Sequence, residues 1–454
     1  MPKQAKTTKK QTKKQNKKQT KKVIEPEEET IIELKQKETV AEEEQQAFLQ
    51  AIHKEEDLHT TSGELDKDHK FWKTEPVTGT GVVVPAKYNN PIHPDIPHEK
   101  VSKVPIPLPS DSMEFCIVDI DNEKEMDEVY VLLKENYVED DDATLRFDYQ
   151  KDFIKWCLKV PGYYPSWFVG IRLKEDHALI GFITGIPTSV KIYDRTVDVA
   201  EINFLCVRKD MRKYKLAPKL IQEVTRQVHL TGLFQAVYTS GTELPNVIAT
   251  AQYFHRPLNP KKLDVIGFST LNKRLTLERA LKLYKLPVNP QTPGFREMEE
   301  RDIDVVTEKL NKYLVNHHDL TILFSKETVK HTFLSRDNIV KSYVVEQNGV
   351  VKAFGAFYIL PSSILNSYEY DTLYVAYQYY FFHDKDIDFK LFFKDILAKS
   401  QQCGCDVFNC LNMSENGKYL ADLLFVPGDG FLKYYLYNWA CPPVTAEKLN
   451  IVLQ

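Results

Sequence analysis

The sequence predicts a mixed α/β protein whose central sheet is built from two halves of like order. Two observations carry this prediction. From residue 113 onward, short runs rich in β-branched and aromatic residues alternate with amphipathic helical patterns. A similar order of strands and helices recurs after residue 296. With 454 residues and 43% hydrophobic content, the chain has room for two domains with ample cores.

The expected elements alternate in both halves. In the first half, strands are expected at 115–118, 168–171, 180–185, 191–193, 201–206 and 234–238, and helices at 123–136 and 219–230. In the second half, strands are expected at 342–345, 353–358, 374–382, 406–409 and 434–438, and helices at 303–313, 389–400 and near 418–424. Gly232 is placed to end the helix at 219–230, because glycine adopts the left-handed conformation that follows many helices.

The N-terminal part of the chain has a different composition. Residues 1–22 hold ten Lys and no acid, and residues 25–44 hold nine Glu. Such segments bury too little apolar surface to fold, so a disordered tail is expected over 1–65. The basic run fits a solubilising tail or localisation signal as well as a contact to an anionic surface such as ribosomal RNA or membrane. A proline-rich, extended connector is expected over 76–109.

Cysteine usage and hydropathy restrict the class of protein. The seven Cys are odd in number, form no CxxC pair, and have no His at zinc spacing near Cys403, Cys405 and Cys410. Core thiols in a reducing cytosol are therefore expected, and no metal site. No apolar run reaches transmembrane length and the N-terminus is not a signal peptide, so we expect a cytoplasmic protein that is not integral to a membrane.

The segment after the 201–206 strand has the composition of a phosphate-binding turn. Arg212, Lys213 and Lys215 lie between the end of this strand and the start of a helix. The first turn of a helix has free backbone N–H groups and carries the positive end of the helix dipole. A solvated basic loop is the plainer alternative, but the flanking strand and helix favour a seat for phosphates.

Two segments of the chain resemble family signatures. Residues 201–209 read EINFLCVRK and closely resemble the EINFLC-x-HK signature of the N-myristoyltransferases, with Arg208 in place of His. Residues 424–430 resemble a second signature of that family, KFG-x-GDG, with Leu424 and Val426 in place of its Lys and first Gly. The resemblance covers the chain from about residue 69 to residue 454.

The resemblance implies a fold and an activity. The family has two tandem acetyltransferase-like halves with a pseudo-twofold relation, placed here at 66–290 and 291–454. It transfers a myristoyl group from myristoyl-CoA to the N-terminal Gly of proteins, without metal, as a monomer that a Lys-rich tail can bring to the ribosome. The departures from both signatures leave two alternatives: an acyl-CoA-dependent N-acyltransferase of other acyl length, or a catalytically impaired lipid- or peptide-binding member.

The resemblance also implies where the donor binds. The first half of the chain would hold myristoyl-CoA, and about a dozen buried methylenes are worth on the order of 10 kcal/mol. The donor-binding residues carried over by position are His69, Lys70, Phe71, Trp72, Phe204, Leu205, Cys206, Val207, Arg212, Lys213, Lys215, Leu216, Ala217 and Pro218.

The implied catalytic groups are mostly main-chain atoms. The N–H groups of Phe204 and Leu205 would form an oxyanion hole, which requires a β-bulge that frees them from the strand ladder. The α-carboxylate of Gln454 would take a proton from the substrate ammonium, which Asn203 and Thr239 would hold. The apolar chain end, 450–454, fits such a buried terminus, although a last strand that merely completes the sheet is the alternative. No nucleophile motif stands out, so direct transfer is expected.

The peptide is expected in a groove of the second half, lined by aromatic and acidic residues. An acidic loop is more often a solvated face, but aromatic neighbours of the 139–142 run favour a site for basic peptide residues. The residues carried over by position are Tyr137, Val138, Asp140, Asp142, Phe147, Tyr149, Tyr238, Gly241, His255, Ser362, Tyr377, Asn409, Asp429 and Gly430.

Overall fold

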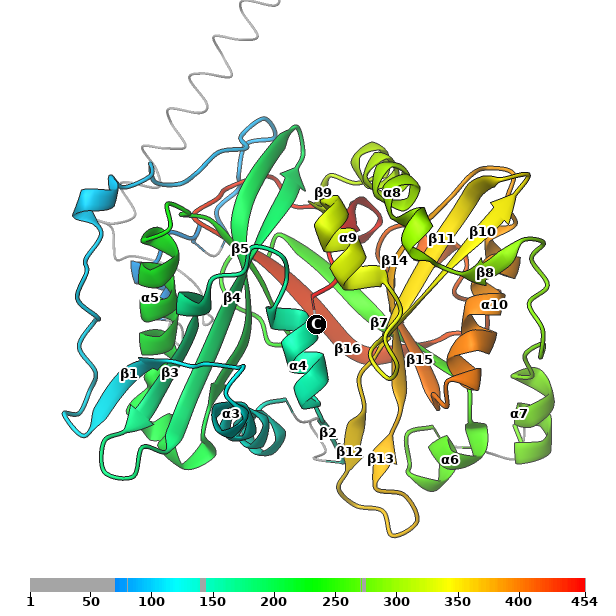
Figure 1. Cartoon of the computed structure of the whole chain (residues 1–454), viewed down its shortest axis with the longest axis horizontal. Helices are drawn as coiled ribbons and strands as arrows, with labels where there is room; N and C mark the ends of the chain where they lie inside the picture. Colours follow the sequence, from blue (N-terminus) through cyan, green and yellow to red (C-terminus); the bar gives the residue numbers. More distant parts are fainter. Residues whose placement is uncertain (1–69, 80, 139–143, 270, 272–274, 454) are drawn as a thin grey trace, which may run out of the picture. The chain divides into compact units, whose positions relative to one another are not determined.

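The computed structural model describes residues 70–453 except 80, 139–143, 270 and 272–274. These residues all belong to one compact unit of the chain, Leu58–Gln454. Within them, strands from both halves of the sequence join in one mixed sheet, with helices on both faces (Figure 1). The mixed α/β class predicted from the alternation of patterns is therefore confirmed.

The first half forms one wing of the sheet. Its strands lie in the order β1 (Met113–Ile117), β3 (Phe168–Leu173), β4 (Leu179–Ile192), β5 (Arg195–Val207) and β6 (Ala236–Ser240). Neighbours are antiparallel except β5 and β6, which are parallel. Helices α3 (Glu123–Asn136) and α4 (Lys151–Leu158) pack in one hydrophobic core and α5 (Leu216–His229) in a second core on the opposite face.

The second half repeats this order. Its strands are β8 (Phe295–Glu297), β10 (Val340–Gln347), β11 (Val350–Ile359), β14 (Val375–His383) and β15 (Val407–Leu411), and only β14 and β15 are parallel. Helices α8 (Ile303–His317), α9 (Lys326–Phe333) and α10 (Phe389–Gln402) follow in the same order as α3, α4 and α5. The recurrence after residue 296 is thus a real repeat of topology.

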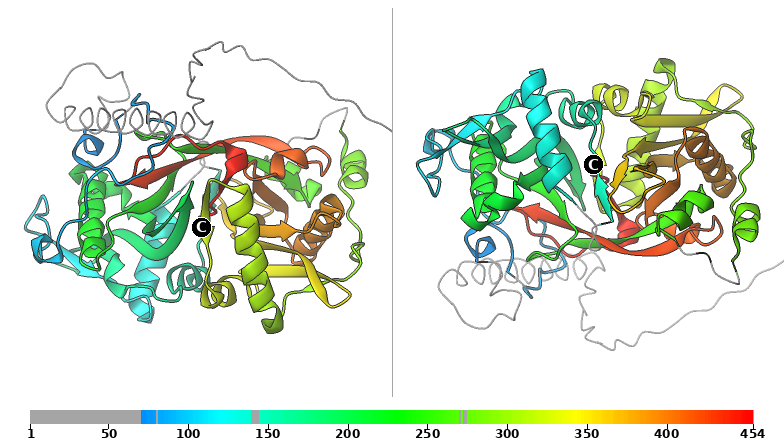
Figure 2. Two further views of the ribbon diagram at one scale, coloured as in Figure 1. Left: turned by 90° about the horizontal axis from the view of Figure 1, so that it is seen from above. Right: turned by 90° about the horizontal axis from the view of Figure 1, so that it is seen from below.

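The two halves exchange their closing strands. β7 (Ala249–Pro257) follows the first half in sequence but pairs with β15, whereas β16 (Val426–Tyr437) follows the second half but pairs with β6. β7 and β16 then pair with each other, antiparallel, at the centre of the sheet. The strand order therefore reads the same from either edge, which is a pseudo-twofold relation. Seen from above and below, the halves lie side by side with the end of the chain between them (Figure 2).

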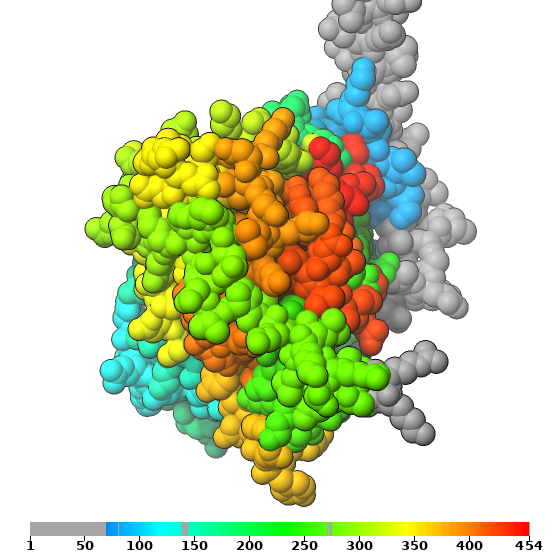
Figure 3. Space-filling view, turned by 90° about the vertical axis from the view of Figure 1, so that its right-hand side faces the viewer, coloured from blue at the N-terminus to red at the C-terminus, as the bar shows by residue number. Residues whose placement is uncertain are grey.

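Shorter elements complete the fold. They are β2 (Leu145–Phe147), β9 (Leu320–Leu323), β12 (Ser362–Ile364), β13 (Thr372–Leu373), β17 (Leu449–Asn450), α6 (Pro260–Val265), α7 (Leu277–Leu283) and the 3-10 turns η1 (Trp72–Thr74), η2 (His98–Lys100), η3 (Pro165–Trp167), η4 (Lys209–Tyr214), η5 (Glu300–Asp302), η6 (Asn416–Lys418) and η7 (Ala446–Lys448). β2, β12 and β13 form a separate small sheet. The α6–α7 segment, in green, and segments late in the sequence, in orange to red, lie on the face shown in Figure 3.

Three expected elements differ from the structure. The helix expected near 418–424 is wrong: only η6 forms there, followed by turns, and Leu424 has φ +62°. A residue in the left-handed conformation cannot continue a right-handed helix, so the apolar pattern of this segment does not form one. Helix α5 begins at Leu216, three residues before the expected start. The strands expected at 180–185 and 191–193 are one strand, β4.

The proline-rich connector is extended, as expected, and is tied to the last part of the chain. The Trp439 indole N–H donates to Asn89 Oδ1 over 2.8 Å, and the His93 N–H donates to Asn438 Oδ1 over 2.8 Å.

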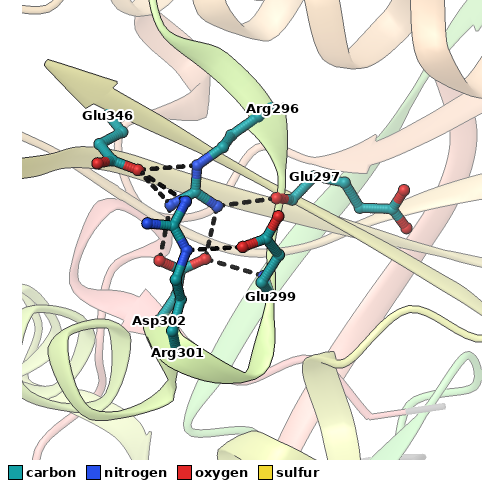
Figure 4. A network of polar contacts seen from close by, with 6 residues as sticks. All are labelled: Arg296, Glu297, Glu299, Arg301, Asp302 and Glu346. Atoms are coloured by element: carbon teal, nitrogen blue, oxygen red, sulfur yellow. Dashed lines mark hydrogen bonds and ion pairs between the residues drawn. The ribbon is translucent and has the colours of Figure 1, made fainter. Parts of the chain in front are cut away.

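At the edge of the sheet formed by β8, ion pairs connect this strand to its neighbours. Arg296 on β8 donates to both oxygens of Asp302 (2.7 and 2.8 Å) and to Glu346 on β10 (2.6 Å), as Figure 4 shows.

Candidate functional site

A cavity of about 680 Å³ lies where the two halves meet, and its lining falls into two groups. The first group comes from η1, α5 and its neighbouring strands: Trp72, Ile183, Ala200, Ile202, Leu205, Ile221, Val224, Thr225, Val228, His229, Phe234, Gln235, Ala236, Tyr238 and Tyr437. The second group comes about equally from the two halves, and includes Tyr137, Val138, Phe147, Tyr149, Gly241, Tyr253, His255, Phe268, Tyr358, Leu360, Ser362, Leu373, Val375, Tyr377, Asn409, Gly430 and Leu453 at the chain end. We call these the α5 branch and the second-half branch.

A β-bulge at Phe204 and Leu205 forms part of the cavity lining. On β4, Ile183 is the single residue between Phe182 and Thr184, which pair with Cys206 and Asn203 on β5, so Phe204 and Leu205 together oppose one residue. Phe204 has φ +54°, the left-handed conformation that such an extra residue adopts. Its side chain packs in the core of α3 and α4, whereas Leu205 packs against the α5 core. The bulge that the oxyanion-hole hypothesis requires is present.

Asn203 organises the polar atoms around this bulge. Its Oδ1 accepts the Phe204 N–H over 2.8 Å and the Tyr137 hydroxyl over 3.3 Å. Its main-chain oxygen accepts the Thr184 hydroxyl over 3.1 Å. The Phe204 N–H therefore points away from the sheet ladder and toward a side chain. Burial raises the pKa of Tyr137, so its hydroxyl remains a neutral donor.

The neighbouring strands separate at the bulge. β5 and β6 pair only at Ala200–Ala236 and Glu201–Val237, and beyond this point no further register pair joins them along these two described strands. The separation leaves room between β5 and β6 exactly where Phe204 and Leu205 lie. Thr239, on β6, lines the cavity on the other side of this opening. The sequence thus places Asn203, Thr239 and the bulge around one point of the cavity.

The expected phosphate seat consists of the turn η4 and the first turn of α5. Helix α5 begins after Lys215, which has φ +53°, and no side chain caps the N–H groups of its first turn. Lys213 and Lys215 are exposed beside them. Arg212 instead donates to Asn136 O (2.7 Å) and Val207 O (3.3 Å), so its guanidinium fastens the turn to the core.

The signature departure at Arg208 has a local explanation. Its guanidinium donates to both oxygens of Asp210, over 2.8 and 3.0 Å, and both side chains face the surface. Its charge is thus matched within the turn η4. Among the remaining residues expected at the donor, Leu216 is buried and Ala217 and Pro218 lie in the first turn of α5. Cys206 is buried against α3 and its Sγ lies 3.7 Å from Leu132 O, so it packs behind the cavity instead of lining it.

Trp72, in the turn η1, lines the α5 branch. Its ring stacks on Tyr238 with centroids 5.5 Å apart, and Tyr238 stacks in turn on Tyr435 at 5.1 Å. Glu75 fixes the turn that carries Trp72, because its Oε2 accepts the Tyr437 hydroxyl over 2.8 Å. Phe71 packs edge-on against Trp72. Lys70 is exposed, and His69 lies outside the described residues.

The last described residues are held inside the protein. Leu449 and Asn450 form β17, which pairs with β9, and the Asn450 carbonyl accepts the Thr321 hydroxyl over 2.9 Å. The Ile451 carbonyl accepts the Tyr434 hydroxyl (2.8 Å), and the Val452 N–H donates to the Tyr380 hydroxyl (3.1 Å). Leu453 lines the cavity. The chain end is therefore buried as expected, while Gln454 itself lies outside the described residues.

The second-half branch brings most of the expected peptide residues together. His255 Nδ1 and Asn409 Oδ1 are 2.7 Å apart, and burial lowers the pKa of His255, so its ring is neutral and Nδ1 carries the proton. Tyr377 stacks on Tyr358 at 5.1 Å. Gly428 lies against the His255 ring: a Cβ on this glycine would be 2.2 Å from Nε2.

Of the three expected acidic residues, the structure describes only Asp429. Asp140 and Asp142 lie outside the described residues. Asp429 is exposed and does not line the cavity, although Gly430 beside it does. The register of β16 against β7 breaks between Pro427 and Phe431, so Asp429 lies on a bulge at the cavity rim.

Sequence reasoning missed part of the lining. Ile221, Val224 and Val228 lie at helical spacing on α5, a pattern that indicates a buried face but does not distinguish a core from a cavity.

Sequence reasoning also missed Glu201 as a buried acid. This residue is 6% exposed, and burial raises its pKa to about 8. An acidic residue inside a strand that is otherwise apolar is the signal that could have found it.

Two further observations concern metals and membranes. In the described part of the chain, no three His, Cys, Asp or Glu side chains are grouped as metal ligands would be. Cys403 is exposed because it follows the last turn of α10, while the other six Cys are buried or half-buried. Across residues 70–453, apart from the gaps, no helix has the length and apolar character needed to cross a bilayer.

The chain is similar to known proteins over most of its length. Residues 91–251 match the model of the myristoyl-CoA:protein N-myristoyltransferase N-terminal domain, and residues 265–451 match that of its C-terminal domain. Glycylpeptide N-tetradecanoyltransferase 1 of Arabidopsis thaliana is 46% identical over 82% of this chain and 86% of the relative. Glycylpeptide N-tetradecanoyltransferase 2 of Danio rerio is 44% identical over 85% and 77%. A crystal structure of Saccharomyces cerevisiae N-myristoyltransferase with bound myristoyl-CoA, 39% identical, aligns with a TM-score of 0.79 over 84% of this chain and 94% of the other.

Proposed function

Because the chain belongs to the myristoyl-CoA:protein N-myristoyltransferase family and is thus an acyltransferase, we propose that it joins the myristoyl group of myristoyl-CoA to an N-terminal glycine by direct attack of the amine. The observation that carries this proposal is the bulge at Phe204 and Leu205, which forms part of the lining of one cavity. One branch would hold the acyl donor and the other the peptide, so the two reactants meet at the bulge.

The donor side fits an acyl-CoA. The apolar α5 branch takes the fatty chain, and the uncapped first turn of α5 with Lys213 and Lys215 takes phosphates of the CoA. Because Arg212 is hydrogen-bonded to two carbonyls, we assign it to holding this turn in shape. Trp72, in the turn η1, closes over the donor. Lys70, Phe71 and His69 are assigned to the same cover by their position in the family motif.

The bulge supplies the oxyanion hole. Attack on the thioester carbonyl places negative charge on its oxygen, and two main-chain N–H donors lower this barrier by a few kcal/mol. The N–H groups of Phe204 and Leu205 take this role. In the structure the Phe204 N–H donates to Asn203 Oδ1. When the thioester oxygen accepts this N–H instead, Asn203 Oδ1 becomes free to accept a hydrogen bond from the substrate ammonium. Thr239 holds the amine from β6.

The α-carboxylate of Gln454 acts as the base. In water, proton transfer from an α-ammonium with a pKa near 8 to a carboxylate near 3.5 costs about 6 kcal/mol. A buried site penalises both charges and narrows this difference. The buried residues 449–453 direct the chain end toward the cavity. The free amine then forms the C–N bond, the C–S bond breaks, and the second amine proton goes to the departing CoA thiolate.

The peptide occupies the second-half branch. His255, oriented by Asn409, and the stacked pair Tyr358–Tyr377 form its walls, with Ser362 and Gly241 also in the lining. The rim aspartate Asp429 recognises a basic residue further along the peptide, together with Asp140 and Asp142 of the acidic run.

Domains, partners and location follow from the same proposal. We assign donor binding to residues 66–290 and peptide binding to 291–454, in a cytoplasmic monomer whose basic segment, 1–22, associates with ribosomes. The exchange of β7 and β16 means that the two assigned domains complete each other's sheet.

A donor and acceptor panel tests the reaction. Acetyl-, myristoyl- and palmitoyl-CoA are each incubated with peptides that begin with Gly or with Ala, and the products are identified by mass. We expect a myristoyl amide on the Gly peptide alone. Faster transfer of another acyl group would identify an acyltransferase of different donor length, and tight myristoyl-CoA binding without transfer would identify a catalytically impaired member.

A further inference from the structure

The second half of the chain has a β-bulge of its own. Between two neighbouring register pairs of β11 and β14, β11 has the single residue Ala356, whereas β14 has both Tyr379 and Tyr380. We call Tyr379 and Tyr380 the second bulge. The last register pair of β14 with β15 is at Tyr377, just before this bulge, and β5 likewise separates from β6 before Phe204. The second bulge is therefore the counterpart, under the pseudo-twofold relation, of the bulge that lines the cavity.

Helix α10 packs against β11 and β14 here, as α5 packs beside the bulge of the first half. The cavity left between α10 and the sheet is only about 10 Å³, and Phe389, Phe392 and Phe393 are part of its lining. The first turn of α10 is capped by the Asp388 side chain, which places a negative charge where the first turn of α5 has none. An acyl chain has no room at this place, and a phosphate would meet a carboxylate.

The second bulge instead contacts the end of the chain. Tyr380 is 1% exposed, and its hydroxyl accepts the Val452 N–H over 3.1 Å. Val452 is only two residues before Gln454, so this hydrogen bond anchors the chain close to the base of the proposed reaction. Because the Val452 N–H is buried, it has no water to replace the Tyr380 hydroxyl if that group is removed.

The residue before the second bulge holds the chain end through a loop. Gln378 Oε1 accepts the Asn416 side-chain amide over 2.6 Å, and this amide also donates to a main-chain oxygen of its own loop over 2.8 Å. In the same loop the Ser414 N–H donates to the Leu449 carbonyl of β17 over 3.1 Å. The second bulge thus reaches the chain end by two routes, one direct and one through this loop.

We propose that Tyr380 is a positioning residue, which fixes the end of the chain so that the α-carboxylate reaches the substrate ammonium. The bulge of the first half supplies the oxyanion hole, whereas its counterpart holds no donor and anchors the base. A displacement of about 1 Å can lower a rate about a hundredfold, so an anchor this close to the base controls transfer. The proposal rests on the proposed function, because it takes the α-carboxylate of Gln454 as the base.

Removal of one hydroxyl tests the anchor. Tyr380→Phe keeps the ring and its packing but takes away the acceptor of the Val452 N–H, which favours release of the chain end by roughly tenfold. Tyr343→Phe is the matched control, because Tyr343 is also a buried tyrosine of the second half and stacks on Phe295 near the β8 edge. Release is followed by mass as carboxypeptidase removes the last residues of the full chain. Steady-state transfer to a Gly-starting peptide and calorimetric binding of myristoyl-CoA are measured on the same proteins.

A second background isolates the chain end. Tyr380→Phe is also made in a chain with one alanine added at the C-terminus, in which the carboxylate is already displaced. If Tyr380 acts through the carboxylate, the two changes are not additive, and Tyr380→Phe causes no further loss of transfer in the extended chain.

In the unextended chain we expect carboxypeptidase to act about ten times faster on Tyr380→Phe than on the wild type, and kcat to fall about tenfold. The peptide KM and the Kd of myristoyl-CoA should stay unchanged, and Tyr343→Phe should behave as the wild type. The proposal is overturned if the chain end of Tyr380→Phe is as resistant as that of the wild type, or if Tyr380→Phe slows transfer equally in the extended chain. If the chain end is released but neither Tyr380→Phe nor the extension slows transfer, the proposed base fails and not the anchor.

Discussion

Replacing Gly428 by alanine tests the second-half branch through the contact between this residue and His255. The new Cβ would lie 2.2 Å from His255 Nε2 and 2.8 Å from Cδ2, whereas real Cβ atoms keep at least about 3.0 Å from their neighbours. The imidazole must therefore move by about 1 Å. Such a shift displaces Nδ1 and misaligns its 2.7 Å hydrogen bond with Asn409. A lost hydrogen bond of this kind is worth about 1 kcal/mol, or about a fivefold change in binding.

The assay separates the peptide from the donor. For Gly428→Ala we expect the KM of a Gly-starting peptide to rise about fivefold, because His255 no longer presents the same wall, while the Kd of myristoyl-CoA stays unchanged. Gly417→Ala is the control, since a Cβ there would meet nothing within 4 Å. In a His255→Ala background the Gly428→Ala effect should disappear, as coupled neighbours require. An unchanged peptide KM in Gly428→Ala would refute the role given to His255.

The other predictions concern buried charges and the rim. Burial raises the pKa of Glu201 from 4.5 to about 8, so the native state binds a proton that the unfolded chain releases, and unfolding free energy should fall as pH rises through this range. In Glu201→Gln the unfolding free energy, measured by denaturant titration at several pH values, should no longer fall over this range. At pH 7 it should exceed that of the wild type by on the order of 3 kcal/mol. If the unfolding free energies of wild type and variant instead change in parallel with pH, the prediction is contradicted. Lys262 Nζ lies 2.6 Å from Asp406 in the core, so Lys262→Met should lower the unfolding free energy by about 3 kcal/mol, and adding Asp406→Asn should restore part of it. If the unfolding free energy does not recover in the double variant, the unpaired Asp406 carboxylate is not the cause of the loss. Asp429→Ala should raise KM more for peptides with a downstream Lys than for those without it; an equal rise for both removes its recognition role.

Local signals in the sequence were sufficient for the strand, turn and helix around the expected phosphate seat. The apolar strand that includes Phe204, the cationic turn and the periodic helix after it are all short-range patterns, and each lies where expected. The bulge was inferred only through the family signature, because Phe and Leu are ordinary strand residues. A positive φ at Phe204 is held by its surroundings, among them Tyr149, whose ring lies 5.1 Å away.

The pairing of strands that lie far apart in the sequence could not be predicted from the sequence. β7 pairs with β15 about 150 residues later in the chain, and nothing in its own residues specifies that partner. The contact between the first half and the connector is of the same kind, since the Gln235 side-chain amide donates to Asp95 from 140 residues away in the sequence. Near 418–424 the spacing of apolar residues suggested a helix, whereas Leu424 adopts a left-handed conformation and packing favours turns.

The role of the chain end can be measured directly. The full chain with one alanine added after Gln454 is compared with Gln454→Ala, which keeps the α-carboxylate in place and changes only the last side chain. With myristoyl-CoA bound first, single-turnover transfer to a Gly peptide should fall at least about a hundredfold in the extended chain, consistent with the loss of a positioned base, and remain near wild type in Gln454→Ala. Binding of myristoyl-CoA should be equal in all three proteins. Undiminished transfer by the extended chain would show that the α-carboxylate is not the base.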